Sequence, residues 1–149
     1  MNNSLFFFFT LLAGIALAVQ TGMNSQLRLA VNNPIFSAVL SFSVGLIALL
    51  LFLTLSRPTN MPTMVSLSQI AWWKWLGGLC GAFYIVVSVI SAPKIGAANF
   101  TALLIAGQLI ASLLLDHFGW VGFKTQPIDW TKIGGAACLL LGVYLIIKK

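Results

Sequence analysis

Five long apolar segments divide the chain, and short stretches rich in polar residues, proline or glycine separate them. A helix needs about 20 mostly apolar residues to cross the hydrocarbon core of a bilayer. The pattern predicts an all-α membrane protein with a single transmembrane domain over residues 1–149. Its five spanning helices are predicted at about 5–26, 35–55, 73–92, 97–116 and 131–147. Pro34 suits the first turn of the second helix, and Pro93 and Gly96 are predicted to break the run between the third and the fourth.

The composition indicates that little of the chain lies outside the bilayer. Of the 149 residues, 60% are hydrophobic and 7% are charged, and the mean hydropathy is +1.02. Soluble domains average about 25% charged residues. All five tryptophans fall at predicted helix ends or in loops, where the indole ring meets both acyl chains and headgroups. Membrane lipid is therefore an expected partner. Nucleic acid is not, because the net charge of +6 comes without a basic cluster.

The eight Lys and Arg residues divide evenly between the two sides of the membrane if the helix count is right. Side one, which includes the N-terminus, carries Arg57, Lys74, Lys124 and Lys132. Side two carries Arg28, Lys94, Lys148 and Lys149. Membrane proteins orient themselves by an excess of Lys and Arg on the cytoplasmic side, and here that excess is 4 − 4 = 0. The balance predicts a chain that inserts in both orientations and pairs with an inverted copy of itself, or with a close paralogue.

The sequence lacks the patterns of an enzyme or a metal site. Cys80 and Cys138 lie in separate apolar helices, which gives neither a disulfide framework nor metal-ligand spacing. No nucleophile–base set, phosphate-binding glycine loop or zinc pattern occurs. We expect no enzymatic activity, no cofactor and no bound metal.

Carboxamide and hydroxyl groups recur on two of the predicted helices. Gln20 and Asn24 are four residues apart in the first helix, and Gln108 and Ser112 are four apart near the middle of the fourth. A buried amide without partners costs on the order of 1–3 kcal/mol. Polar pairs between membrane helices stabilise by only about 0.6 kcal/mol on average. A polar solute pocket between the first, third and fourth helices is therefore favoured, and interhelical packing alone is the alternative.

The third helix carries a small, polar face in which one residue is large. Gly77, Gly81, Tyr84, Ser88 and Ser91 follow one another at steps of four, three, four and three. Glycine and serine at such spacing are typical of close helix packing in lipid. Tyr84 is amphipathic and lies near the middle of its helix, so it either lines a cavity or packs against a neighbouring helix.

Asp116 is the acid nearest to the core of a predicted spanning segment, and His117 follows it directly. A carboxylate deep in a bilayer is costly and is a functional candidate by default. Histidine titrates near neutral pH, so the two residues are candidates for proton coupling. Alternatively, Asp116 faces the headgroups at its helix end and pairs with Lys124 or His117, because end positions cost far less than central ones.

Four stretches of the chain resemble the YdcZ-like family of the bacterial drug/metabolite transporter superfamily. They are 20–27 (QTGMNSQL), 73–82 (WKWLGGLCGA), 92–98 (APKIGAA) and 107–119 (GQLIASLLLDHFG). The resemblance spans nearly the whole chain and implies a five-helix half-transporter in the bacterial inner membrane. It also implies an antiparallel dimer that is similar to the fused ten-helix members, with export as the usual activity.

The resemblance and the polar residues lead to one expected function. The four-helix multidrug exporters of the superfamily carry a Glu in the first helix, whereas this chain has Gln20 and Asn24 there and no acid. We therefore expect a small-molecule transporter for a polar or amphipathic metabolite rather than a strong cation, working by alternating access as a dual-topology homodimer. Its solute would contact Gln20, Asn24, Tyr84, Gln108 and Ser112. A passive dual-topology pore and a non-transporting membrane subunit are the alternatives.

Overall fold

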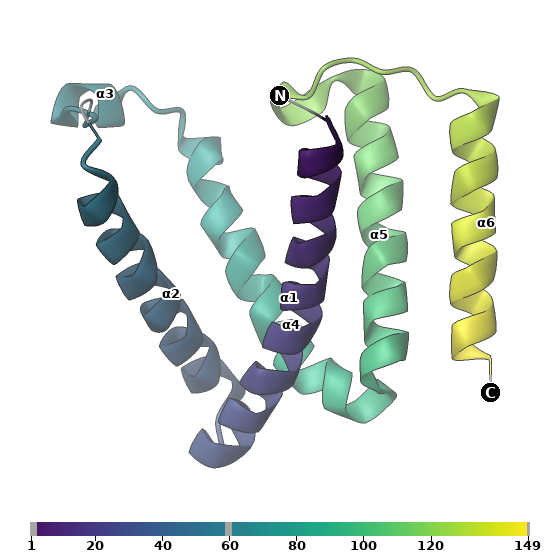
Figure 1. The fold of residues 1–149 in the computed structure, drawn as a ribbon, viewed down its shortest axis with the longest axis horizontal. Coiled ribbons are helices and arrows are strands. Elements are labelled where there is room, and N and C mark those ends of the chain that lie inside the picture. The colour runs from purple at the N-terminus through teal and green to yellow at the C-terminus, as the bar shows by residue number, and fades with distance from the viewer. Residues whose placement is uncertain (1–2, 59–60, 149) are drawn as a thin grey trace. The chain divides into compact units, whose positions relative to one another are not determined.

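The computed structural model describes residues 3–58 and 61–148, and every regular element in that part of the chain is helical (Figure 1). The long helices are α1 (Asn3–Val31), α2 (Pro34–Ser56), α4 (Leu76–Ile95), α5 (Ala97–Phe118) and α6 (Trp130–Ile147). The short ones are α3 (Met64–Ser68), η1 (Trp72–Trp75) and η2 (Trp120–Gly122).

Within residues 3–58 and 61–148, five helices are long and apolar enough to cross a membrane, which confirms the predicted all-α fold with five candidate spanning segments. They cover Ser4–Val31, Pro34–Ser56, Trp72–Ile95, Ala97–Phe118 and Trp130–Ile147. Helix α3, with five residues, is far too short to be a sixth, since a helix rises about 1.5 Å per residue. The helix count on which the division of the charges rests is therefore unchanged.

Two helices end several residues later than predicted, each for a local reason. Helix α1 continues past residue 26 to Val31, because nothing before Asn33 and Pro34 disrupts the helical hydrogen bonds. The prediction that Pro93 breaks the third spanning helix is wrong, since α4 runs through Pro93 to Ile95. Gly96, with φ of 88°, ends the run instead, because this left-handed backbone favours glycine.

Side chains cap the starts of two spanning helices. The Asn33 side-chain oxygen accepts hydrogen bonds from the Ile35 and Phe36 N–H groups at 2.9 and 3.0 Å, and Pro34 occupies the first turn of α2 as predicted. The Asp129 carboxylate accepts from the Lys132 N–H at 2.7 Å at the start of α6. Asp129 therefore has a structural role that its position before an apolar run could have indicated.

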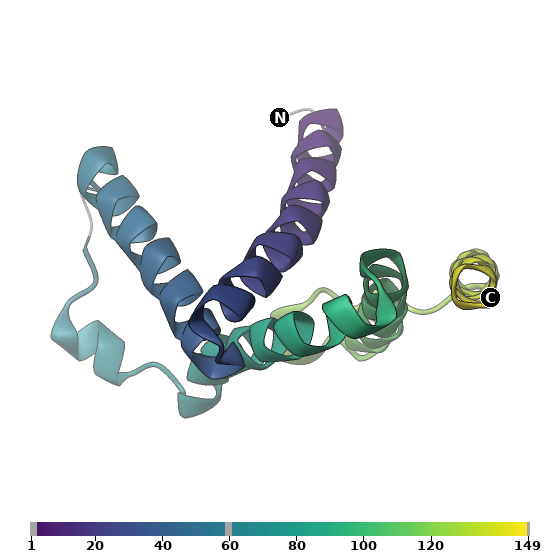
Figure 2. The ribbon, with the colours of Figure 1, turned by 90° about the horizontal axis from the view of Figure 1, so that it is seen from below.

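The chain divides into two compact units at Pro93. In the first unit α1 and α2 form a hairpin, and both views show the two helices converging at their short connection and diverging away from it (Figures 1 and 2). Ala38 of α2 packs with Ile85 and Val89 of α4 in a small core. Tyr84, Val86 and Ile90 pack against that core. Helices α1, α2 and α4 thus form one small bundle.

In the second unit, from Lys94 onward, α5 and α6 pack side by side (Figure 1). Ala102 and Ala106 of α5 meet Val143 of α6, with Leu139 beside them. Alanines allow the two backbones to approach closely, which is how helices associate in lipid.

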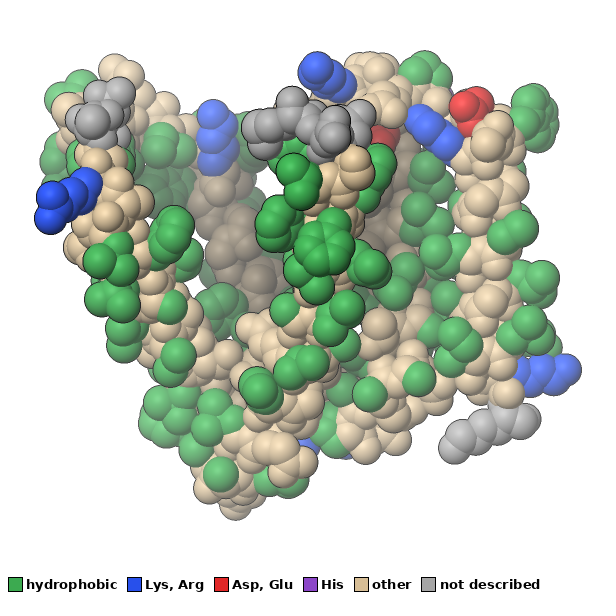
Figure 3. Space-filling model, in the orientation of Figure 1, with side chains coloured by type: hydrophobic (Ala, Val, Ile, Leu, Met, Phe, Trp, Pro, Cys, Tyr) green, Lys and Arg blue, Asp and Glu red, His purple; other side chains and the backbone are tan. Residues whose placement is uncertain are grey.

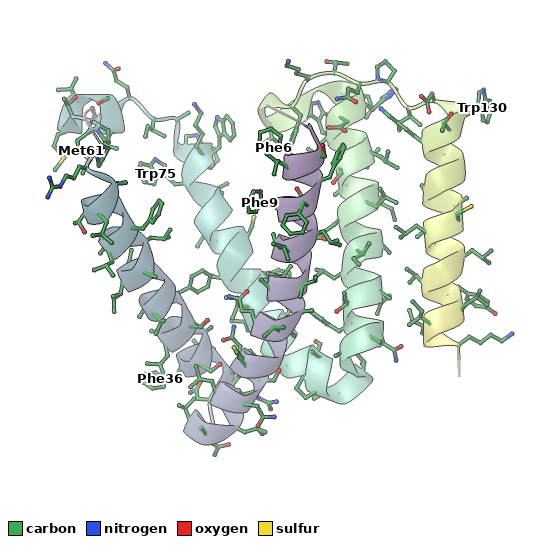
Figure 4. All side chains as sticks on the ribbon, viewed as in Figure 1. Phe6, Phe9, Phe36, Met61, Trp75 and Trp130 are labelled. Carbon is green, nitrogen blue, oxygen red and sulfur yellow. The ribbon has the colours of Figure 1, made fainter. Side chains whose placement is uncertain are left out.

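The outer surface has the pattern expected of a protein in a bilayer. Hydrophobic side chains cover the middles of the helices, and the Lys and Arg side chains lie near the helix ends (Figure 3). Trp75 leads into α4 and Trp130 begins α6, and both side chains are exposed (Figure 4). Trp120 lies just beyond the end of α5, in η2. The tryptophans therefore lie at helix ends, as the sequence predicted.

Candidate solute-binding site

One face of α1 turns a row of polar side chains toward the other helices of the first unit. Thr21, Asn24 and Ser25 are buried and Arg28 is half-buried, and together we call them the α1 polar stripe. Their spacing of three and four residues keeps them on one face of the helix. The stripe ends in the last turn of α1, where the positive charge of Arg28 is favourable to the helix dipole.

Most hydroxyl groups around the stripe are satisfied by helix backbone or by each other. The Thr21 and Tyr84 hydroxyl oxygens are 3.2 Å apart and share a hydrogen bond that joins α1 to α4. The Ser37 hydroxyl, fully buried on α2, donates to the Asn24 backbone oxygen at 3.3 Å. The buried Ser88 hydroxyl donates to Ile85 of its own helix at 2.8 Å. The first two bonds tie the three helices together, and all three account for Thr21, Ser37 and Ser88 without a solute.

Arg28 satisfies a carbonyl that Pro93 leaves without a donor. In an α-helix the carbonyl of residue 89 accepts from the N–H of residue 93, and proline has no N–H. The Arg28 guanidinium Nη1 donates to the Val89 oxygen at 3.3 Å. Val89 is 0% exposed, so water cannot easily take that place. This bond explains how α4 continues through Pro93, since neighbouring groups make proline tolerable in membrane helices.

We expect Arg28→Met to lower the free energy of unfolding in mixed micelles by about 1–3 kcal/mol, because a buried carbonyl loses its donor. In a Pro93→Ala background the same substitution costs much less, since the alanine N–H bonds the Val89 carbonyl. A double-mutant cycle by detergent-induced unfolding measures the difference. An equal cost of Arg28→Met in both backgrounds would contradict this account of the bond.

A cavity of about 360 Å³ opens beside the stripe, within the size range of small-molecule sites. Its lining is mostly apolar, with one amide and one hydroxyl. The lining residues are Gln20, Ser41, Phe42, Gly45, Leu46, Leu49 and Ile85. A second cavity of about 490 Å³ shares Phe42 and Leu46 with it and is otherwise almost wholly apolar. Both cavities are open on one side, and together they form an apolar groove with a few polar groups, which suits an amphipathic ligand.

The structure places three predicted site residues in the first unit, in different settings. Gln20 is exposed and lines the smaller cavity. Asn24 is buried in the stripe. Tyr84 is half-buried, packs against the Ala38–Ile85–Val89 core and bonds Thr21. Tyr84 therefore takes part in helix packing, and its part in a solute site stays a prediction.

The predicted residues of the second unit lie on the exposed part of α5. Gln108 and Ser112 are both exposed, and the Ser112 hydroxyl donates to the Gln108 backbone oxygen at 2.7 Å. The contact with α6 is made elsewhere on the helix, through Ala102 and Ala106. Gln108 and Ser112 lie outside this buried core, and their part in a solute site stays a prediction.

Asp116 and His117 are held by the loop that follows α5. The Asp116 backbone oxygen accepts from the Gln126 N–H at 2.7 Å, and the His117 Nδ1 accepts from the Ile128 N–H at 3.1 Å. Over residues 3–58 and 61–148, the Asp116 carboxylate forms no ion pair with His117 or Lys124. The pairing considered from the sequence is absent there, and a role of these two residues in coupling stays a prediction.

Sequence reasoning missed Thr21, Ser25, Arg28 and Ser37 as neighbours of the site. The signal for the first three was present, because they extend the Gln20–Asn24 pattern along the face of a single helix. A second signal was Pro93, whose missing N–H predicts an unpaired carbonyl four residues earlier. Ser37 could be found only from the way α2 returns against α1.

The fold defines the class of the molecule: an all-helical, multi-pass membrane protein with polar groups buried between its helices. The chain belongs to the family described as "Putative inner membrane exporter, YdcZ", whose model matches residues 5–145. It is 30% identical to "Inner membrane protein YdcZ" of Escherichia coli (strain K12) over 150 aligned residues, which cover 100% of this chain and 99% of that protein. No solved structure matches. The family and the inner-membrane location predicted from the sequence are confirmed, and the family is described by export, not by catalysis.

Proposed function

We propose that this protein exports a small polar or amphipathic metabolite across the inner membrane by alternating access. The observation that carries the proposal is the cavity in the first unit, which offers the Gln20 amide and the Ser41 hydroxyl among apolar groups. Polar groups inside a membrane bundle are expensive and mark a solute path by default. Membership of an exporter family supports the direction of transport.

The working unit that we propose is an antiparallel homodimer, with a close paralogue as the alternative partner. Transporters commonly place their site between two inverted repeats. The even division of the cations over an odd number of spanning helices lets the same chain insert in either orientation, so it can supply both inverted halves of the dimer. On α6, Gly134 and Gly135 have open space where a Cβ would stand, so a second backbone can approach there.

The solute chemistry follows from the charges. Residues 1–93 contain no Asp or Glu, so the bundle of α1, α2 and α4 offers nothing to pair with a cationic solute. In the proposed dimer the solute exchanges hydrogen bonds with the side chains of Gln20, Asn24, Gln108 and Ser112. Tyr84 supplies an aromatic wall, and Asp116 and His117 are the candidates for coupling.

A comparison of exported metabolites tests this function. Cells that overproduce the protein should accumulate at least one polar or amphipathic metabolite in the medium, several-fold above cells with the empty vector, as measured by untargeted mass spectrometry. Overproduced Gln20→Leu, present at the same level in the membrane, is the matched control. If no metabolite separates wild type from the empty vector, the export function fails. Purified protein in vesicles then distinguishes export from a passive pore, because only a transporter accumulates the solute against its gradient.

A further inference from the structure

The Asn24 side chain is largely buried and has no hydrogen-bond partner among residues 3–58 and 61–148. Asn24 is 6% exposed, and its backbone oxygen accepts from Ser37. Within the described residues its side-chain amide forms no hydrogen bond, although its polar atoms are not fully enclosed. The amide nitrogen and oxygen therefore reach the surface of the bundle, where a group from outside the chain can bond them. The Asn24 amide is therefore available to a ligand.

Arg28, one helical turn further along α1, forms no ion pair within the part of the chain that the structure describes. Its guanidinium has five N–H groups, and the bond to the Val89 oxygen uses one of them. Residues 1–93 contain no carboxylate side chain at all, so the first unit cannot neutralise Arg28. The bond to Val89 also holds the planar guanidinium in place, so the remaining donors keep their orientation.

Asn24 and Arg28 are four residues apart on one face of a helix, where Cβ atoms are about 6 Å from each other. A carboxylate or phosphate group accepts hydrogen bonds through two or more oxygens and prefers guanidinium donors. We propose that the Asn24 amide and the Arg28 guanidinium form a subsite for an oxyanion. The proposal rests on the proposed function in one respect: the oxyanion is the acidic group of the exported amphipathic solute. A lipid phosphate has the same chemistry and is the second source.

The test uses the full-length protein, purified in an uncharged detergent and stripped of lipid. Thermal unfolding is followed at constant ionic strength with benzoate, hexanoate or inorganic phosphate, and separately with added phosphatidylglycerol or phosphatidylcholine. We expect wild type to be stabilised in a saturable way by at least one of these oxyanions and not by phosphatidylcholine. No stabilisation by any of them overturns the proposal.

Two amide-to-acid substitutions on α1 form a matched pair. Asn24→Asp keeps the size of the side chain, places a carboxylate beside Arg28 and should weaken oxyanion binding at least tenfold. Gln26→Glu adds the same charge on the exposed side of α1 and should change binding less than twofold. Arg28→Lys keeps the charge and should retain part of the binding, whereas Arg28→Met should lose it. Equal binding by Asn24→Asp and wild type overturns the subsite even if the arginine variants fail to fold.

The arms of this experiment distinguish a solute from a lipid headgroup as the source of the oxyanion. They also distinguish failure of the oxyanion subsite from failure of the export function. A response to benzoate or hexanoate assigns the subsite to a solute, and a response to phosphatidylglycerol alone assigns it to a lipid headgroup. Both responses support the subsite. Oxyanion binding in a protein that exports nothing overturns the proposed function and leaves the subsite standing. Export that Asn24→Asp leaves unchanged overturns the subsite as part of the solute site and leaves the function standing.

Discussion

Gln20→Leu should lower the initial rate of export about tenfold at equal amounts of protein in the membrane. Gln20 supplies the amide of the 360 Å³ cavity, and leucine removes its donor and acceptor while keeping a similar volume. A neutral hydrogen bond contributes about 0.5–1.5 kcal/mol, and a polar group of the solute left unpaired in the site costs a further 1–3 kcal/mol. The measurement is the rate of efflux of the metabolite identified by mass spectrometry.

Gln26→Leu is the control for this substitution, because it makes the same change on an exposed position of the same helix. Its export rate should stay within twofold of wild type. Gln108→Leu then tests whether the exposed face of α5 belongs to the same site. A tenfold loss there places Gln108 on the solute path, and an unchanged rate restricts the site to α1, α2 and α4. Equal rates for wild type and Gln20→Leu would contradict the cavity as the site.

The second large effect concerns the orientation of the chain. Alkaline phosphatase and green fluorescent protein fused at the C-terminus should both be active in separate cell populations, because the cations do not favour either orientation. Replacing Lys148 and Lys149 with Ala leaves four cations on side one and two on side two. Most chains should then retain side one in the cytoplasm and place the C-terminus outside.

The opposite double substitution is the matched control for topology. Arg57→Ala with Lys124→Ala removes two exposed cations from side one and should move the C-terminus into the cytoplasm. These two positions are preferable to Lys132, whose ammonium group donates to the Gln126 and Pro127 backbone oxygens. A wild-type chain with a single fixed orientation would contradict the antiparallel homodimer.

The five spanning helices and the location in the membrane could be predicted from local pattern alone. Each spanning helix satisfies its own backbone hydrogen bonds in lipid, so its presence depends on its length and its apolar character. The start of α2 at Pro34 follows from its cap in the same way. The exception at Pro93 shows the limit of this reasoning, since proline disrupts a helix only when nothing else takes over the lost bond.

The candidate site was predicted in part, because polar residues at helical spacing identify a face but not the groups opposite it. Gln20 and Asn24 were found from their spacing and lie in the first unit beside a cavity and in a buried stripe. The hydrogen bond between Tyr84 and Thr21 could not be predicted, because the two residues are 63 positions apart in the chain. Arg28 was counted from the sequence only as an orienting charge, although it also donates to α4.

The sequence by itself determined that this is a five-helix inner-membrane protein with balanced cations and no acid in its first three spanning helices. These properties are sums over local composition, and no contact between helices changes them. Only the tertiary structure decided which polar groups bond other groups of the bundle and which remain available to a ligand. Thr21, Ser37 and Ser88 are hydrogen-bonded within the bundle, whereas the amide of the mostly buried Asn24 has no partner among the described residues. Whether a polar group has a partner depends on the helix packed opposite it, and that requires the fold.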